Sequence, residues 1–414
     1  MNIGFVGLGK LGLPCALAID SFKEHNVIGY DPDERIKEYL NQKSIPYREE
    51  GANKLLENHN IEIKSLKDVI KNSELIFVPI QTPHDPLYDG VTRLPDTRVD
   101  FDYSYLIEGL KQISLELDEL KEDRIIIIIS TVLPGTIENQ IKPILSKYAK
   151  LCYNPFFIAM GTTINDYLNP EFVLFGVDDI EASEKVKEFY TTLHNKDVYE
   201  CTLDEAELIK VSYNTFITMK ICLANTVTEL SHKLKNIDAD NVMSALKLAN
   251  QRLISEKYLT GGMGDGGGCH PRDNIALSWL SQKVDLSYDW YENLMISREK
   301  HTDWLAELTI NSSLKSDLGI TILGKSFKKE TNLINGSPAY LLKTLIEEKG
   351  HKVEMYDPHI DDTEIDLTVP KVFFIATNHD IFIKYKFPKG SVVIDPWRMI
   401  ENQKDIELIS IGIS

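Results

Sequence analysis

The stretch NIGFVGLGKLGLP, residues 2–14, decides the fold of the first part of this 414-residue chain. Its apolar run Asn2–Val6 is typical of a buried strand, and three glycines then follow at the spacing Gly-x-Gly-x-x-Gly before a helical pattern. Glycines at this spacing allow a tight turn, close approach of the backbone to a pyrophosphate, and close helix–strand packing. The first N–H groups of the helix can bind the anion. The pattern predicts a dinucleotide site, with a purely structural glycine turn as the alternative; its residues are Gly7, Gly9, Lys10, Leu11 and Gly12.

An acidic residue follows the second strand-like run. Val27–Tyr30 is apolar, and Asp31 comes directly after it, about 20 residues beyond the glycines. A carboxylate at this position can accept hydrogen bonds from the adenosine ribose hydroxyls, and it would repel a 2′-phosphate. The spacing therefore predicts NAD rather than NADP as the cofactor, whereas a solvated aspartate is the structural alternative.

Short apolar runs alternate with amphipathic segments on both sides of a helical middle region. This alternation is typical of βαβ units on a parallel sheet, where strands are buried on both faces. From Leu203 to about Lys235 apolar residues recur at helical spacing without Pro or Gly, which predicts one long helix. The chain is therefore expected to be α/β, then helical, then α/β. The expected strands are Asn2–Val6, Val27–Tyr30, Leu75–Pro79, Ile125–Ser130, Leu151–Tyr153, Val173–Gly176, Gly319–Gly324, Lys352–Tyr356, Val372–Ala376 and Ser391–Ile394, with a helix at Ser337–Lys349.

Composition excludes several classes of protein. With 45 Lys and Arg against 63 Asp and Glu, the net charge is −18, which disfavours non-specific binding to nucleic acid or to anionic membranes. The run Ile125–Ile129 is far too short to cross a bilayer, and the N-terminus does not resemble a signal peptide. Five cysteines at irregular spacing do not form a disulfide framework, so we expect a cytoplasmic protein. No metal site is predicted.

One cysteine follows a glycine-rich loop. Residues 261–268 contain six glycines, and Cys269 comes next, at the start of another helical pattern. Such a loop lets backbone N–H groups approach a ligand, and a helix N-terminus stabilises a thiolate nucleophile. An incidental cysteine in a mobile loop is the alternative. The other four cysteines lie in apolar or helical contexts and are expected to be packing residues: Cys15, Cys152, Cys201 and Cys222.

Two polar residues of the long helix share one face. Lys210 and Asn214 are four residues apart, and Asn225 lies three turns beyond Asn214. Such a pair could orient a substrate hydroxyl and a catalytic water. A solvated helix face is the alternative, and it is the more usual environment of a helical lysine.

Five motifs in this order resemble those of the nucleotide-sugar 6-dehydrogenases, the UDP-glucose/GDP-mannose dehydrogenase family. The resemblance extends over nearly the whole chain. The motifs are GLGKLGLP at residues 7–14, STVLPGT at 130–136, AELIKVSYN at 206–214, GGGCHPRD at 266–273 and ILGKSFKKET…GSPA across 322–339.

The resemblance implies two Rossmann-like doubly wound domains joined by a helical domain with a long central helix. The domains would be an NAD-binding domain at residues 1–200, a central dimerisation domain at 201–310 with the cysteine loop, and a nucleotide-sugar-binding domain at 311–414. It also implies a homodimer, a role in polysaccharide biosynthesis and a four-electron reaction at C6 of a nucleotide sugar, with UDP-glucose as the default substrate. The thiolate of Cys269 would bind the intermediate aldehyde and form a thioester that water hydrolyses.

The resemblance also implies roles for individual residues. Lys210 would stabilise the alkoxide or oxyanion, Asn214 would hold the same oxygen, and Asp273 would orient the water or the lysine. Thr131 would lie near the nicotinamide or the water, and Thr82 and Pro83 would contact the cofactor. The nucleotide sugar would be bound by Lys210 and Asn214 together with Arg252, Tyr258, Gly266, Phe327 and Lys328.

The chain departs from the family pattern at three places. Phe156 stands where the family has a glutamate with a role in thioester hydrolysis, and Glu171 is not expected to replace it. The stretch Thr331–Asn335 lacks the usual acid and arginine, and Arg272 replaces a lysine. These departures keep two alternatives open: a two-electron dehydrogenase, either of the hydroxy-acid type or stopping at the aldehyde or thioester, and a degenerate NAD-binding protein. His270, next to Cys269, could assist hydrolysis or could be a solvated loop residue.

Overall fold

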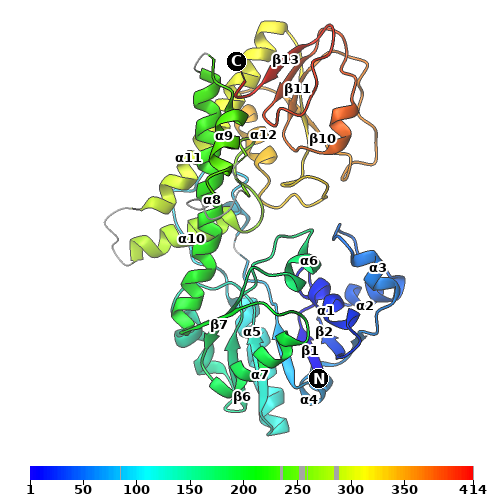
Figure 1. Cartoon of the computed structure of the whole chain (residues 1–414), viewed down its shortest axis with the longest axis vertical. Helices are drawn as coiled ribbons and strands as arrows, with labels where there is room; N and C mark the ends of the chain where they lie inside the picture. The colour runs from blue at the N-terminus through cyan, green and yellow to red at the C-terminus, as the bar shows by residue number, and fades with distance from the viewer. Residues whose placement is uncertain (84, 234–235, 251–256, 259, 284–288, 414) are drawn as a thin grey trace. The chain divides into compact units, whose positions relative to one another are not determined.

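The computed structural model divides the chain into two compact units (Figure 1). The first unit contains residues 1–83 and 101–212, and the second contains residues 84–100 and 213–414. The division into three domains at 1–200, 201–310 and 311–414 stays a prediction. The residues that the structure describes are 1–83, 85–233, 236–250, 257–258, 260–283 and 289–413.

The first unit is built on an eight-stranded sheet with the order β3-β2-β1-β4-β5-β6-β7-β8. Neighbouring strands are parallel except β6 and β7, which are antiparallel. The order 3-2-1-4-5-6 is that of a doubly wound Rossmann sheet, whose switch point lies between β1 and β4. The strands are β1 (Asn2–Val6), β2 (Asn26–Tyr30), β3 (Glu62–Ile63), β4 (Leu75–Val78), β5 (Arg124–Ile128), β6 (Ala149–Tyr153), β7 (Val173–Val177) and β8 (Val198–Cys201).

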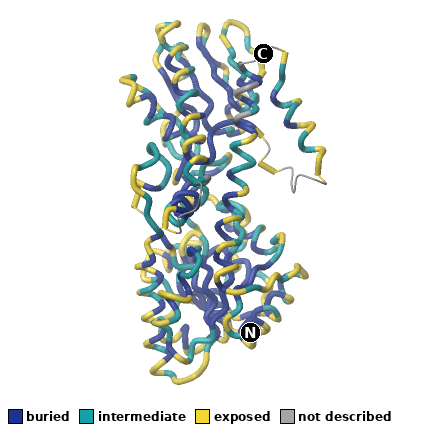
Figure 2. Tube along the Cα trace, turned by 90° about the vertical axis from the view of Figure 1, so that its left-hand side faces the viewer, coloured by how far each residue is buried: buried dark blue, intermediate teal, exposed yellow. Residues whose placement is uncertain are grey.

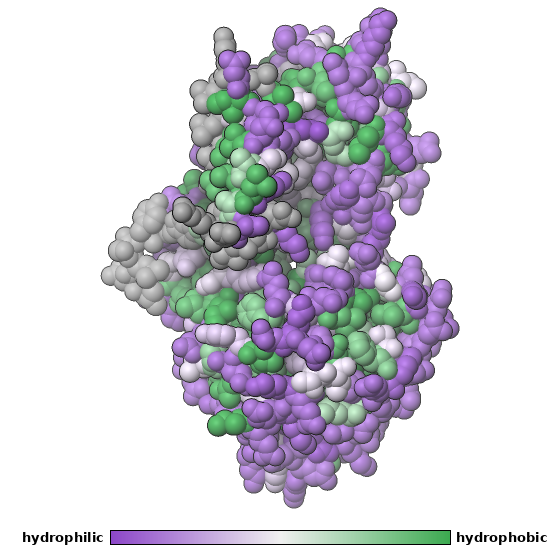
Figure 3. Space-filling model, viewed as in Figure 1, coloured by the Kyte–Doolittle hydropathy of each residue, from purple (hydrophilic) through white to green (hydrophobic). Residues whose placement is uncertain are grey.

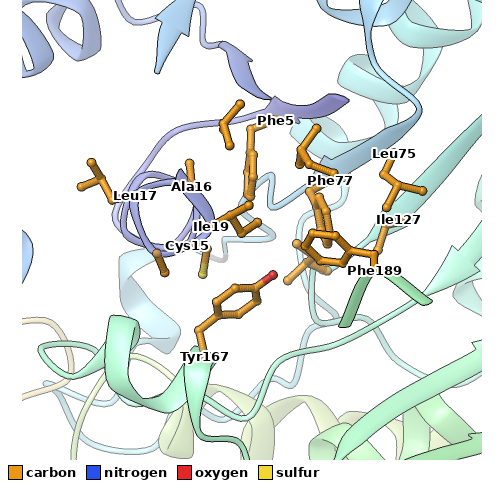
Figure 4. Packing of buried hydrophobic residues seen from close by; sticks show 14 of the residues in the cluster. Phe5, Cys15, Ala16, Leu17, Ile19, Leu75, Phe77, Ile127, Tyr167 and Phe189 are labelled. Atoms are coloured by element: carbon orange, nitrogen blue, oxygen red, sulfur yellow. The ribbon is translucent and has the colours of Figure 1, made fainter. Parts of the chain in front are cut away.

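Aromatic and aliphatic side chains fill the core between the sheet and its helices. Phe5 and Phe77, from adjacent strands, stack with ring centroids 5.2 Å apart, and Phe189 lies against Phe77 at 5.5 Å (Figure 4). Cys15 and Cys152 are fully buried in this core, as the sequence predicted. The helices of the unit are α1 (Gly12–Ser21), α2 (Arg35–Gln42), α3 (Ala52–Glu57), α4 (Leu66–Asn72), α5 (Ser104–Leu120), α6 (Thr163–Leu168) and α7 (Ile180–Thr191).

A single long helix, α8, extends from Leu203 to Lys233, which confirms the predicted long helix (Figure 1). It begins in the first unit and ends in the second. Thr202 and Glu205 form a capping box at its start, since Thr202 Oγ1 accepts from the Glu205 N–H and Glu205 accepts from the Thr202 N–H. Buried polar residues line one side of α8, and this contradicts the solvated-face alternative for Lys210 and Asn214.

The second unit contains a parallel five-stranded sheet with the order β10-β9-β11-β12-β13. This is also a doubly wound order, with its switch point between β9 and β11. The two sheets confirm the predicted α/β fold class with two Rossmann-like sheets and a helical middle region. The elements are β9 (Ile320–Leu323), β10 (Val353–Tyr356), β11 (Val372–Ile375), β12 (Val392–Asp395), β13 (Glu407–Ser410), α9 (Ala239–Lys247), α10 (His270–Lys283), α11 (Trp290–Ser316) and α12 (Pro338–Glu348).

The central strands of each sheet are dark blue in Figure 2, which marks them as buried. All ten predicted strands are present, with ends shifted by one or two residues. Three short strands were not predicted: β3, β8 and β13. Their residues are mostly exposed or half-buried, so they lack the continuous apolar run that marks a central strand.

Hydrophilic side chains predominate on the face drawn in Figure 3, in keeping with the net charge of −18. Apolar side chains gather there over α8 and α9 (Figure 3). Among the described residues, none of the helices has the length and apolarity that a bilayer crossing needs.

Candidate active site

The glycine loop of the first unit follows β1 at the switch point of the sheet. Gly7 has φ +111°, a conformation that side chains other than glycine rarely adopt. A Cβ on Gly12 would lie 2.1 Å from the carbonyl oxygen of Gly7, so residue 12 must be glycine for α1 to start here. A Cβ on Gly9 would meet nothing within 4 Å, which leaves open space beside the loop. This geometry fits a pyrophosphate at the N-terminus of α1.

Asp31 joins the end of β2 to this loop. Its Oδ2 accepts from the N–H of Leu8 at 2.6 Å, and its Oδ1 accepts from the N–H of Asp33 at 2.9 Å. The carboxylate therefore lies at the carboxyl edge of the sheet beside the glycine turn. Lys10 is exposed and Leu11 is half-buried at the start of α1, where both flank the same loop.

The loops after β4 and β5 are joined by their threonines. Thr82 is buried, and its hydroxyl donates to the carbonyl oxygen of Thr131 at 2.8 Å. Pro83 is half-buried beside Thr82. The two loops thus lie together at the carboxyl edge of the sheet, on the same side as the glycine loop, because β1, β4 and β5 are parallel neighbours.

A buried glutamate, which the sequence analysis missed, ties this edge to α8. The side chain of Glu207 is 0% exposed and accepts from the N–H groups of Gly135 at 2.6 Å and Ile137 at 2.8 Å. Burial raises the pKa of Glu207 to about 7, although these two hydrogen bonds act in the opposite direction. The helix thereby holds the loop that follows Thr131 at a fixed place.

Lys210 lies one turn after Glu207 and is 6% exposed. Its Nζ is 5.4 Å from the ring centroid of Phe157, a cation–π distance. Phe156, next to Phe157, is half-buried and packs against the core of the first unit, where its ring lies at a tilt to that of Tyr167 with the centroids 5.1 Å apart. Phe156 is therefore a packing residue, whereas the ring of Phe157 lies near the ammonium group of Lys210.

In the second unit, Cys269 immediately precedes α10. The thiol is free and half-buried, and the carbonyl oxygen of Cys269 accepts from the N–H of Asp273 in the first helical turn at 2.8 Å. The positive end of the helix dipole favours a negative charge at this place. By contrast, burial raises the pKa of the Cys152 and Cys222 thiols to about 12, which keeps both protonated at neutral pH.

Asp273 is fully buried and has partners on both carboxylate oxygens. Asn214 Nδ2 donates to Oδ2, and Arg272 donates from Nε to Oδ1 at 2.9 Å. In the second unit a side-chain hydrogen bond therefore joins Asn214 to Asp273, and Cys269 lies one helical turn before Asp273. Arg272, which the sequence analysis marked as a departure, is the cation of this group.

The glycine loop before Cys269 is held at both of its ends. Asn225 Oδ1 accepts from the Gly262 N–H at 2.9 Å, and its Nδ2 donates to the carbonyl oxygen of Met263 at the same distance. Further along, a Cβ on Gly266 would lie 2.5 Å from Pro338, and a Cβ on Gly267 would lie 3.2 Å from the ring of Phe327. Glycine is required where the loop packs this closely, and the packing brings Gly267 beside Phe327 and Gly266 beside Pro338.

The Phe327 loop lies outside the carboxyl end of β9, at the switch point of the second sheet. Asp357, directly after β10, accepts from the N–H groups of Lys325 at 2.7 Å and Ser326 at 3.0 Å. It also contacts the buried His379 at 3.2 Å. Burial alone would raise the pKa of Asp357, but these hydrogen bonds hold it well below its usual range. The half-buried Lys328 follows on this fixed loop.

Two further residues were predicted to bind the substrate, Tyr258 and Arg252. Tyr258 is exposed, with a left-handed φ of +67°. Arg252 lies outside the described residues. Several residues that hold the site were not predicted, because nothing local in the sequence distinguishes them from solvated or capping residues: Glu207, Asp265, Asp357 and His379.

Two family models match the chain. The NAD-binding domain of the UDP-glucose/GDP-mannose dehydrogenase family matches residues 1–194, and the central domain of the same family matches residues 204–297. The chain belongs to the UDP-glucose/GDP-mannose dehydrogenase family. Its first unit therefore contains an NAD-binding domain, and the glycine loop has the geometry that this cofactor needs.

Curated relatives in this family act on different sugars. A UDP-glucose 6-dehydrogenase of Rickettsia bellii is 29% identical over 371 residues, covering 86% of this chain and 81% of the relative. A GDP-mannose 6-dehydrogenase of Pseudomonas aeruginosa is 26% identical over 374 residues, covering 87% and 82%. Family membership thus establishes an NAD-dependent nucleotide-sugar dehydrogenase and leaves the sugar open.

Solved structures of the family share the fold over the whole chain. A UDP-glucose dehydrogenase from Pyrobaculum islandicum has a TM-score of 0.86 at 21% identity, covering 100% of this chain and 98% of that one. A UDP-D-ManNAc dehydrogenase from Pyrococcus horikoshii has a TM-score of 0.81 at 22% identity, covering 100% and 99%.

Proposed function

We propose that this protein oxidises the C6 hydroxyl of a nucleotide sugar, with UDP-glucose as the first candidate, to the uronic acid in two steps. The observation that carries the proposal is the group of Cys269, Asp273 and Asn214 at the start of α10. A nucleophile, a buried carboxylate and an amide held together in one place suit covalent chemistry on a carbonyl.

NAD, when bound, would accept one hydride in each oxidation, so two NAD molecules would be reduced for each sugar. The residues that would hold it are those of the glycine loop and the adjoining edge. Gly7, Gly9 and Gly12 would accommodate the pyrophosphate with Lys10 and Leu11 beside it, Asp31 would meet the ribose, and the loops of Thr82-Pro83 and Thr131 would contact the rest of the cofactor.

Cys269 would retain the intermediate. Oxidation of the C6 alcohol yields an aldehyde, and the thiolate adds to its carbonyl carbon to form a thiohemiacetal. A second oxidation leaves a thioester, which water cleaves to the acid and the free thiolate. The balance is one alcohol and one water consumed, one carboxylate formed, and four electrons transferred in two hydrides.

The polar residues of α8 would act on the C6 oxygen. Lys210 would stabilise its negative charge as alkoxide and as tetrahedral oxyanion, and Asn214 would donate a hydrogen bond to the same atom. Asp273, held by Asn214 and Arg272, would keep the amide in the orientation that this hydrogen bond needs. Thr131 would lie next to the nicotinamide or the attacking water.

The nucleotide end of the substrate would lie at the switch point of the second sheet. The packing of Gly267, the neighbour of Gly266, against Phe327 and the loop that Asp357 fixes support binding by Gly266, Phe327 and Lys328. Arg252 and Tyr258 complete the proposed set.

A homodimer through α8 is part of the proposal. Phe216 and Leu223 are 40% and 48% exposed and lie seven residues apart on one face of the helix. Apolar side chains gather over α8 and α9 on the surface in Figure 3. An exposed apolar stripe of this kind suits burial against a second copy.

The free cysteines support a reducing, cytoplasmic location.

A panel of UDP-glucose, UDP-N-acetylhexosamines and GDP-mannose tests the proposal. We expect two NADH for each sugar consumed, with the uronic acid as product. One NADH for each sugar would favour a two-electron enzyme that stops at the aldehyde, and NAD binding without NADH production across the panel would favour a degenerate binding protein. Both outcomes would refute the four-electron reaction.

A further inference from the structure

We infer that His270, held by the buried carboxylate of Asp265, is the general base that activates water for hydrolysis of the Cys269 thioester. The inference rests on the proposed function, because it assigns a residue to the last step of that reaction.

The imidazole of His270, the residue that follows the nucleophile, is held by a hydrogen bond to Asp265. His270 is the first residue of α10 and follows Cys269 directly. Its Nδ1 lies 2.6 Å from Oδ1 of Asp265, in the glycine loop. A carboxylate can only accept, so Nδ1 carries the proton and Nε2 carries the basic lone pair of the neutral ring. This is the arrangement in which a histidine accepts a proton and an aspartate stabilises the resulting cation.

Asp265 is buried beside an arginine. It is 2% exposed, and Nε of the buried Arg298 donates to its carbonyl oxygen at 2.5 Å. Oδ2 of Asp265 and Nη2 of Arg298 have no hydrogen-bond partner among the described residues. Both residues line a cavity of about 180 Å³ together with Asn225 and His301. The guanidinium of Arg298 also attracts the carboxylate of Asp265, which offsets part of the cost of burying this partner of the imidazole.

Other groups near the reaction are less suited to accept the proton. Both carboxylate oxygens of Asp273 are occupied, one by Asn214 and the other by Arg272. Phe156 offers only a phenyl ring, and that ring packs in the core of the first unit. His270 can take a proton without breaking any hydrogen bond of that buried group.

The hydrolytic step balances as follows. The water oxygen attacks the thioester carbon while one of its protons passes to Nε2 of His270. The tetrahedral oxyanion then collapses, the C–S bond breaks, and the sulfur of Cys269 leaves with the electron pair as thiolate. The acid ionises and releases the second proton, and the imidazolium returns the first to solvent. No oxidant or reductant takes part in this step.

The test separates oxidation from hydrolysis in single-turnover experiments. The full-length wild-type protein and the variants H270Q, D265N and H351Q are mixed with excess NAD and the sugar that gives NADH in the panel, starting with UDP-glucose. NADH is followed by absorbance, the acid by chromatography, and any adduct on Cys269 by intact-protein mass spectrometry. H351Q is the matched control, because His351 follows α12 and has no place in the proposed site.

We expect H270Q to form two NADH for each site at the wild-type rate and then to hydrolyse about 100-fold more slowly, which is the contribution typical of a general base. The acyl adduct should accumulate on Cys269, and neutral hydroxylamine, a stronger nucleophile than water, should release it. D265N should have the same effect to a smaller extent, and H351Q should behave as the wild type.

Two results would overturn the inference. Hydrolysis by H270Q at the wild-type rate would exclude His270 as the base, and equal slowing of NADH formation and hydrolysis would assign it a structural role. Failure of the proposed function has a different signature, since the wild type itself would then not yield two NADH.

The pH profile of hydrolysis gives an independent readout. The wild-type rate should fall at acidic pH as the imidazole becomes protonated, and H270Q should lose this limb. Titratable or charged groups from α8, α11 and the 84–100 segment line the cavity beside Asp265 or act electrostatically on Arg298. The comparison is therefore made within one set of variants; these groups are Cys222, Arg298, Glu299, Lys300, His301 and Asp89.

Discussion

Replacing Glu207 by glutamine should remove a pH dependence from the stability of the protein. The carboxyl group ionises near pH 4.5 when it is unperturbed, and burial raises its pKa to about 7 in the folded chain. Between these two values the unfolded chain releases a proton that the folded chain retains. The stability that the protonated Glu207 carboxyl group contributes is therefore present in full below about pH 4.5, and this contribution is lost as the pH rises through about 7.

The magnitude follows from the size of this pKa shift. One pKa unit corresponds to about 1.4 kcal/mol, so the full effect of the shift is about 3 kcal/mol. Roughly 2 kcal/mol of this falls between about pH 5.5 and about pH 8.5. In E207Q one of the two loop N–H groups, of Gly135 or Ile137, loses its acceptor, which costs about 1–3 kcal/mol at every pH. This loss lowers the stability of E207Q by the same amount at every pH. The test therefore measures how the difference in stability between E207Q and the wild type changes with pH.

Thermal or urea unfolding of the wild type, E207Q and E184Q across this range measures the effect. Glu184 is an exposed glutamate of α7 in the same unit, so E184Q controls for the loss of a carboxylate. Between about pH 5.5 and about pH 8.5, we expect the free energy of unfolding of E207Q to rise by about 2 kcal/mol relative to that of the wild type. This corresponds to a relative rise in Tm of roughly 4–8 °C. A difference that stays constant with pH, or the same trend in E184Q, would refute the reasoning.

Three further predictions concern the proposed sites. C269A should abolish formation of the acid while NAD still binds, as measured by product analysis and cofactor titration; acid formation at the wild-type rate would exclude the thiol. G12A should lower NAD affinity by about tenfold or more, because its Cβ would lie 2.1 Å from the Gly7 carbonyl oxygen, and unchanged binding in calorimetry would contradict this. D31S should narrow the preference for NAD over NADP by about tenfold, through loss of repulsion of the 2′-phosphate, and an unaltered ratio of kcat/KM would contradict that role.

The central strands could be predicted because parallel strands buried on both faces leave continuous apolar runs. Arg124–Ile128 is such a run, and it forms β5 in the middle of the first sheet. Glu62–Ile63 has only two residues at an edge, so no periodicity marks it. The placement of residues 84–100 in the second unit was not predicted either. In this segment Arg93 forms ion pairs with Glu299, Asp303 and Glu348, which lie more than 200 positions away in the sequence, so no local pattern reveals these contacts.

The same distinction applies to the site. Cys269 and the glycines of the first loop stand in local patterns, whose chemistry can be judged from neighbouring residues. Lys210 could not be told from a solvated helical lysine, because its burial depends on the residues that cover α8. His270 was equally ambiguous, because its contact with Asp265 at 2.6 Å depends on how the glycine loop folds.

The residues that hold the loops share one hydrogen-bonding arrangement, which cannot be recognised from their neighbours in the sequence. Glu207 binds two N–H groups after Thr131, Asp357 binds two before Phe327, and Asn225 binds an N–H and a carbonyl oxygen of the cysteine loop. In each case one buried side chain satisfies two backbone groups of a loop that carries proposed site residues. Removing such a side chain leaves buried polar groups without partners and releases the loop. Conservative changes at these three positions should therefore impair catalysis, although none of the three side chains is proposed to touch the substrate or the cofactor.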